Sequence, residues 1–325
     1  INGTGGNGTS GNVGVFVNGT NALITSATGA VTVTGVGGNG TANSNYGTYL
    51  LTGGQITSTG SATLTINGTG GGTGSSASNH GIVLDTNTSI SSNGNNAASV
   101  RLYGTKGVNS SSGITTNGTN TLGSATQTGN IELYSDSWGT ALTNIITSGQ
   151  VIFAPLTAGN SIGLNSGAGT VSIPNSWIAA INTVAPSKLV LGSTVGTGAV
   201  TIGSGWDLSS ATTFPSFAGY TTPVEIYGGS ITTSSITAGS KSLLLRANTG
   251  NITLNSGTTL SSSASGNAIT LAAAGNFINN AGSSALSTPN GRWLVYSTNP
   301  ASDTVGGLSN SFRRFSCTYG GSCPS

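Results

Sequence analysis

The chain carries few side chains that could do chemistry: six carboxylates, one histidine and two cysteines. The carboxylates are Asp85, Glu132, Asp136, Asp207, Glu225 and Asp303. Enzymes that cleave polysaccharides need paired acids, for general acid–base catalysis or for holding calcium. Glu132 and Asp136 are close in sequence, and Asp85 precedes them by one or two repeats. A polysaccharide-active enzyme is therefore kept as a minor alternative.

The single histidine, His80, would have to serve any Ser-His-Asp arrangement. Equivalent positions of the repeat described below hold Val13 and Tyr46, which indicates a packing or surface position. Residues 35–40 fit the pattern G-x-G-x-x-G, but a turn-like segment and a strand follow instead of the helix that a dinucleotide site needs. The glycine-rich turns also lack the aspartates of calcium-binding repeats. We predict no catalytic, cofactor-binding or metal-binding residues, and no cofactor.

A phrase of glycine followed by three strand-forming residues recurs at residues 14–17, 47–50 and 81–84, about 33 residues apart. Each copy is followed by a second apolar run that alternates with period two, which predicts strands. Self-similarity of this kind predicts units that bury their apolar faces only by stacking on their neighbours. We expect an all-β chain forming a right-handed parallel β-helix, a rod-like solenoid in which each strand pairs with its equivalent in the next coil.

Three regions follow from the pattern. Residues 1–136 form a β-helix with the long repeat, and residues 137–290 form a β-helix with shorter, irregular coils. Within the second region, residues 174–181 lack strand alternation and are expected to form a short helical turn or a loop. Residues 206–224 are predicted to leave the coil, with aromatic side chains that cover an exposed edge or side.

The third region, residues 291–325, is rich in aromatic residues and is predicted to be a C-terminal cap. An open β-helix end is a strand edge that could pair with other chains, and proteins usually cover such edges. The predicted cap residues are Trp293, Tyr296, Phe312, Phe315 and Tyr319. Cys317 and Cys323 have no further metal-ligating residues nearby, which favours a local structural disulfide in an oxidising compartment.

Composition limits the partners. Only 4% of residues are charged, against roughly 25% in an average soluble protein, and the net charge is +2. The basic residues are scattered, so no nucleic-acid partner is expected. No run of apolar residues is long enough to span a membrane. Asn-Gly-Thr triplets leave glycans open as partners, although turn chemistry alone also produces them; they begin at Asn2, Asn7, Asn18, Asn39, Asn67 and Asn117.

Two stretches near the end of the chain resemble the one that closes the β-helical region of haemagglutinin-like large exoproteins. They are residues 275–280 (Gly-Asn-Phe-Ile-Asn-Asn) and 291–297 (Gly-Arg-Trp-Leu-Val-Tyr-Ser). This family comprises the filamentous haemagglutinin-type, two-partner-secreted adhesins of Gram-negative bacteria. Residues 306–308 and 312–324 continue the resemblance. It implies a β-helical stalk on or outside the cell, acting in adhesion or surface structure, and it brings no catalytic residues. The amino-terminal secretion domain of that family is not visible, so we expect an internal or processed piece of a longer exoprotein.

The leading hypothesis is a non-enzymatic, extracellular structural and adhesive β-helical rod, at the surface of a Gram-negative bacterium, whose partner is a host or environmental surface. The alternative is a subunit of an extracellular filament or sheath, whose partners are other copies of the chain in head-to-tail or lateral contact. Low charge favours this alternative because it removes the repulsion between copies.

Overall fold

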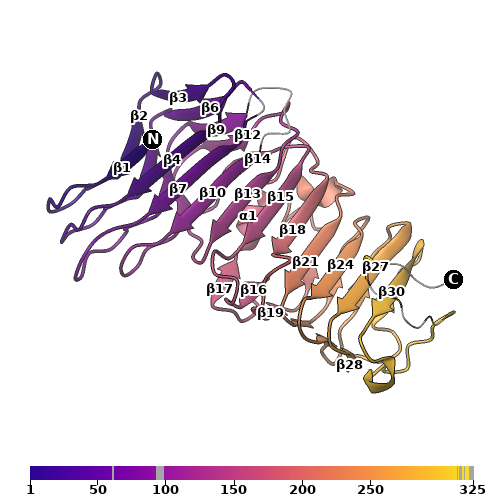
Figure 1. The fold of residues 1–325 in the computed structure, drawn as a ribbon. Coiled ribbons are helices and arrows are strands. Elements are labelled where there is room, and N and C mark those ends of the chain that lie inside the picture. Colours follow the sequence, from indigo (N-terminus) through magenta and orange to yellow (C-terminus); the bar gives the residue numbers. More distant parts are fainter. Residues whose placement is uncertain (61, 93–98, 313, 315–316, 318, 322–325) are drawn as a thin grey trace. The chain divides into compact units, whose positions relative to one another are not determined.

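The computed structural model describes residues 1–60, 62–92, 99–312, 314, 317 and 319–321. The chain forms two compact units. Unit 1 comprises Ile1–Thr157 and Ser176–Ser187, and unit 2 comprises Ala158–Asn175 and Lys188–Ser325. In both units parallel strands of successive coils lie side by side (Figure 1). The all-β, parallel β-helix prediction is confirmed.

Three parallel sheets build unit 1, and successive coils add their strands to these same sheets. The first sheet contains β1 (Asn2–Thr4), β4 (Val31–Val36), β7 (Leu64–Thr69), β10 (Val100–Thr105), β13 (Ile131–Ser135) and β15 (Gln150–Ala154). The second contains β2 (Val15–Asn18), β5 (Thr48–Leu51), β8 (Ile82–Leu84) and β11 (Ile114–Thr116). The third contains β3 (Leu23–Ser26), β6 (Gln55–Ser58), β9 (Thr88–Ser92), β12 (Asn120–Gly123) and β14 (Asn144–Ile146).

Unit 2 also has three parallel sheets, and the strands of its third sheet are only two residues long. Its first sheet contains β18 (Lys188–Gly192), β21 (Val224–Gly228), β24 (Leu243–Ala247), β27 (Gly266–Ala273) and β30 (Gly291–Tyr296). The second contains β17 (Val171–Ile173), β16 (Ile162–Leu164), β19 (Val200–Ile202), β22 (Ile231–Thr233), β25 (Ile252–Leu254) and β28 (Phe277–Asn279). The third contains β20 (Trp206–Asp207), β23 (Ile236–Thr237), β26 (Leu260–Ser261) and β29 (Leu286–Ser287).

Strand alternation places one side chain in two inside each coil. Val33, Ile66 and Leu102 stand opposite one another in β4, β7 and β10, and all three are fully buried. The intervening Thr32, Thr65 and Arg101 face outward in the same register. The stacked apolar rows form the core, and the outward rows form long flat faces available to partners.

Short helices interrupt the strands at α1 (Asn175–Ala179), η1 (Phe217–Gly219) and η2 (Pro300–Ser302). The first confirms a helical turn within residues 174–181. In the segment 206–224, the aromatic side chains of Trp206, Phe214 and Phe217 are buried. The prediction that this segment leaves the coil and covers an edge or side stays a prediction.

Glycine-rich arms connect the first and second sheets of unit 1, at residues 37–46 and 70–80 for example (Figure 1). Successive arms pack backbone against backbone: Gly37 N–H donates to Thr69 O one coil on, and Gly71 N–H donates to Asn45 O of the preceding arm. A Cβ at Gly71 would overlap the Gly38 carbonyl, so only glycine permits this approach.

A ladder of polar side chains locks the returning half of each arm. The Asn12 amide donates to Asn45 Oδ1 at 2.7 Å, and the Asn45 amide donates to Asn79 Oδ1 at 2.9 Å. The Asn79 N–H then donates to Ser111 Oγ at 2.8 Å. Asn45 and Asn79 are fully buried. Asn45 and Asn79 directly precede Tyr46 and His80, so the ladder holds the backbone from which these two side chains project, just before β5 and β8.

Candidate functional site

Each of the four aspartates has hydrogen-bond partners within the chain. Asp85 accepts from the Tyr49 hydroxyl and the Thr86 backbone; Asp136 accepts from Thr157, Asp207 from Ser209, and Asp303 from Phe277 N–H and the Ser297 hydroxyl. Their hydrogen bonds are thus directed to hydroxyls and to backbone N–H groups. Among the described residues, histidine, cysteine, aspartate and glutamate nowhere gather in a group of three that could hold a metal ion.

The two glutamates lie on the first sheets, each beside a cation and a tyrosine. Glu132 Oε2 is 3.0 Å from Arg101 Nε and accepts from the Tyr134 hydroxyl. In unit 2, Glu225 Oε1 is 2.8 Å from Lys188 Nζ and Oε2 accepts from the Tyr227 hydroxyl. The proposed trio Asp85, Glu132 and Asp136 therefore binds three different sets of neighbours. The arrangement offers salt bridges on a flat face.

His80 occupies the packing position that the repeat indicated. Its Nδ1 accepts from Ser112 N–H at 2.9 Å, and its ring stacks on Tyr46, with centroids 5.7 Å apart. Tyr46 is its equivalent in the previous coil, since Tyr49 pairs with Val83 in the same register. Burial lowers the pKa of His80 below the ordinary value of 6.5, so the ring is neutral at neutral pH.

The predicted cap is not confirmed. Trp293 and Tyr296 lie in β30, the last strand of its sheet, and both are only half-buried. Phe312 is 54% exposed. Phe315 lies outside the described residues, as does Cys323, so the Cys317–Cys323 disulfide stays a prediction.

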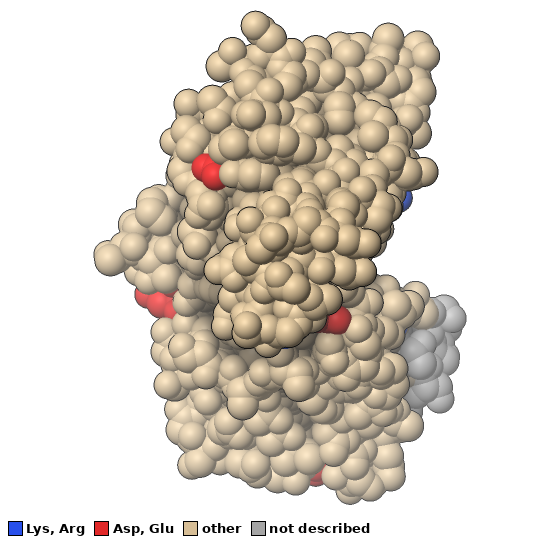
Figure 2. All heavy atoms as spheres, turned by 90° about the vertical axis from the view of Figure 1, so that its left-hand side faces the viewer, with Lys and Arg blue, Asp and Glu red and all other residues tan. Residues whose placement is uncertain are grey.

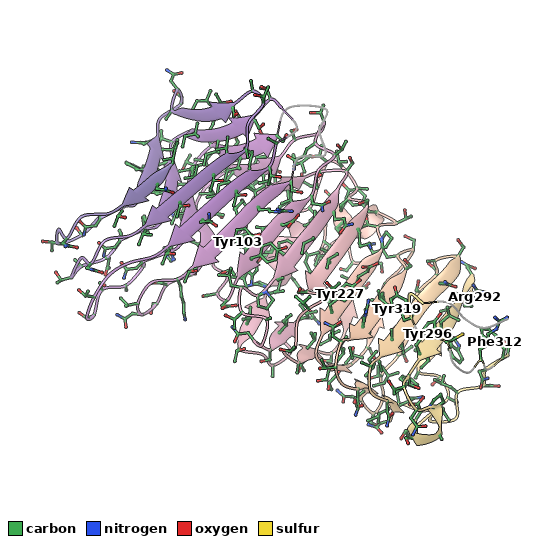
Figure 3. All side chains as sticks on the ribbon, in the orientation of Figure 1. Tyr103, Tyr227, Arg292, Tyr296, Phe312 and Tyr319 are labelled. Carbon is green, nitrogen blue, oxygen red and sulfur yellow. The ribbon has the colours of Figure 1, made fainter. Side chains whose placement is uncertain are left out.

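Tyr319 lies against the outer face of the first sheet of unit 2, whereas a cap would close the coil. Its ring is 5.6 Å from that of Tyr296, and the Arg246 guanidinium is 5.5 Å from its centroid (Figure 3). Leu244 and Ala272 alternate with inward residues of this sheet, yet each is buried. The described part of the tail thus packs along a face.

The second sheet of unit 1 carries a surface that the sequence reading did not single out. We call Phe16, Tyr46, Tyr49 and His80 the aromatic row. Phe16 and Tyr49 are paired in β2 and β5, with rings stacked at 5.1 Å and 19°, and Tyr46 meets Tyr49 edge-on at 5.0 Å. Phe16 is 52% exposed, and the other three members are partly exposed.

One carboxylate, that of Asp85, lies beside the aromatic row. Residues 1–84 contain no lysine, arginine, aspartate or glutamate. The first charged side chain, Asp85, accepts from the Tyr49 hydroxyl at 3.0 Å and from Thr86. Burial and this carboxylate raise the pKa of Tyr49, which keeps its hydroxyl protonated. Figure 2 shows one face of the molecule, on which charged side chains are few and scattered.

A second aromatic pair provides a contrast. Tyr103 and Tyr134 stack at 4.8 Å and 6° on the outer face of the first sheet of unit 1 (Figure 3). They stand beside the Arg101–Glu132 ion pair. One aromatic surface of unit 1 thus borders a single carboxylate, and the other borders an ion pair.

Comparison with family models, with curated proteins and with solved structures finds no match for this chain. In the described part of the chain, no helix has the length and apolar character that crossing a membrane requires.

Proposed function

We propose that this chain is a non-enzymatic, extracellular structural and adhesive β-helix, a piece of a large secreted or cell-surface exoprotein of a Gram-negative bacterium. The observation that carries the proposal is the pairing of stacked coils with outward-facing rows of aromatic and uncharged polar side chains. Stacked coils hold the outward side chains of successive strands in register, which suits contact with an extended surface. The resemblance of residues 275–280 and 291–297 to the stretch that closes the β-helical region of such exoproteins supports the location.

Every carboxylate has an ion-pair or hydrogen-bond partner within the chain, and this supports a non-enzymatic role. A general acid or base must reach its substrate, and paired catalytic carboxylates stand close to each other across the scissile bond. Here Glu132 and Glu225 pair with cations, and the aspartates accept from hydroxyls and backbone N–H groups. Incubation with soluble polysaccharides tests this directly: release of new reducing ends or unsaturated products would contradict the proposal.

Adhesion itself is tested with the purified chain coupled to microspheres and applied to host-cell monolayers and to abiotic surfaces. We expect attachment above that of microspheres coated with an unrelated β-rich protein. Attachment no greater than this control would refute the adhesive role.

A second candidate function, assembly into a filament or sheath, is favoured by the charge-free segment at residues 1–84. Copies that carry little charge repel one another weakly. Negative-stain microscopy distinguishes the two functions, since regular polymers of uniform width would favour assembly over a solitary adhesive stalk.

A further inference from the structure

The aromatic row has the properties of a binding surface for an uncharged, extended ligand. Phe16 and Asn18 alternate on β2 and so face outward together, and both are exposed. Phe16 offers an aromatic ring, and Asn18 offers an amide that both donates and accepts hydrogen bonds. Tyr49 continues the ring surface in the next coil.

Charge selects among the classes of partner. Nucleic acids and acidic polysaccharides need cations to replace their counterions. Residues 1–84 supply none, and the nearby carboxylate of Asp85 would repel an anion. A cationic partner would meet only this one carboxylate, which already accepts from Tyr49 and Thr86.

Once anionic and cationic partners are set aside, a neutral polysaccharide fits the surface that the aromatic row offers. The C–H groups of sugar rings pack on exposed aromatic surface, which Phe16 supplies because it is 52% exposed. Sugar hydroxyls need hydrogen-bond donors and acceptors, which the exposed amide of Asn18 supplies. Coils repeat about every 4.8 Å, close to the length of one sugar in an extended chain. The Phe16–Tyr49 centroid separation of 5.1 Å follows this repeat. A chain running across the strands would therefore meet one coil per sugar.

We infer that the aromatic row binds an extended neutral polysaccharide, with Phe16 and Tyr49 as the ring contacts and Asn18 as a hydrogen-bonding group. This inference rests on the proposed adhesive function and names the ligand class for one of its surfaces. The Asn12–Asn45–Asn79 ladder positions the row, because Asn45 and Asn79 directly precede Tyr46 and His80.

The test is native gel electrophoresis of the full chain through gels that contain soluble β-glucan, mannan or dextran, with polygalacturonate as the acidic counterpart. We expect retardation in at least one neutral polymer and none in polygalacturonate. The apparent affinity should be the same at low and high salt, because salt screens charge interactions and this surface has almost none.

Variants locate the site. Phe16→Ala and Tyr49→Ala should each weaken binding about tenfold, as expected when a ring contact worth about 1.4 kcal/mol is lost. Tyr49→Phe keeps the ring and should bind as the native chain does. Tyr134→Ala is the matched control, since it disrupts a stacked pair on a charged outer face. Circular dichroism shows that each variant is folded.

Three outcomes would overturn the inference. The first is no retardation in any neutral polymer, and the second is equal loss of binding in Tyr134→Ala and Phe16→Ala. The third is self-association in sedimentation experiments that Phe16→Ala abolishes, which would make a second copy the occupant. If microspheres carrying Phe16→Ala adhere as well as the native chain, the row is refuted while the adhesive function stands. If native microspheres do not adhere, the adhesive function itself is refuted.

Discussion

Replacing Asn79 with alanine should damage both the arm and the aromatic row. Asn79 is fully buried, and its Oδ1 accepts from the Asn45 backbone N–H at 3.0 Å and from the Asn45 side-chain amide at 2.9 Å. Its own amide donates to Ser76 Oγ at 3.0 Å. Alanine removes all three bonds and leaves a buried backbone donor without this acceptor.

The magnitude follows from these bonds. An unsatisfied buried N–H costs about 1–3 kcal/mol, and each of the two side-chain bonds contributes about 1 kcal/mol. The expected loss in the free energy of unfolding is about 3–5 kcal/mol. Asn12→Ala is the matched control, because Asn12 is only half-buried and its backbone N–H still donates to Asn45 Oδ1. Its expected loss is about 1 kcal/mol.

Urea unfolding followed by circular dichroism measures both losses, with equal m-values required for the comparison. Amide hydrogen exchange adds a local readout: protection at Asn45 and Gly47 should fall in Asn79→Ala more than in Asn12→Ala. Equal losses in the two variants, or a loss below about 1 kcal/mol in Asn79→Ala, would refute the ladder as the element that holds the arms.

Three further predictions concern single positions. Burial lowers the pKa of His80 below 6.5, so the native chain should lose stability as the pH falls below that value, because the unfolded chain then binds more protons. His80→Tyr should remove this loss. A pH-dependent step in the urea midpoint that persists in His80→Tyr would contradict the assignment. Thr52 is β-branched with φ of 50°, so Thr52→Gly should stabilise by about 1 kcal/mol, and a lower thermal midpoint would show that the backbone is not strained there. Lys241 is fully buried, and its Nζ donates to Ala218 O at 2.9 Å. Lys241→Ala should therefore lower the free energy of unfolding in urea by about 2–5 kcal/mol. An unchanged urea midpoint would mean that the side chain does not support residues 206–220.

The repeat predicted much of the fold because it combines two signals, alternation within a strand and recurrence between coils. The phrases at residues 14–17, 47–50 and 81–84 overlap β2, β5 and β8, and the following apolar runs lie in β4, β7 and β10 with the expected parallel pairing. The strands of the third sheet of unit 1 were not predicted from the sequence. In unit 1 these strands hold only one or two apolar residues each, as in Gln55–Ser58, so alternation there is weak.

The surface was harder to predict than the core. Phe16 and Tyr49 belong to the repeated phrase, but which of its residues face outward depends on the register that neighbouring coils impose. The uncharged run of residues 1–84 was readable from the sequence and would have marked a surface of low charge. The course of the tail was not readable, because aromatic residues near a terminus suit a cap and a sheet face equally well. Tyr319 lies on the face because Arg246 and Tyr296 offer it a cation and a ring there.

The most direct test of the account is retention of the native chain on a surface at low and high salt, measured with a quartz-crystal microbalance on sensors coated with host-cell matrix or with neutral polysaccharide. The account predicts stable retention that high salt does not weaken, because the contact surface carries almost no charge. Absence of retention on every coating, or retention that high salt abolishes, would contradict adhesion through neutral outer faces.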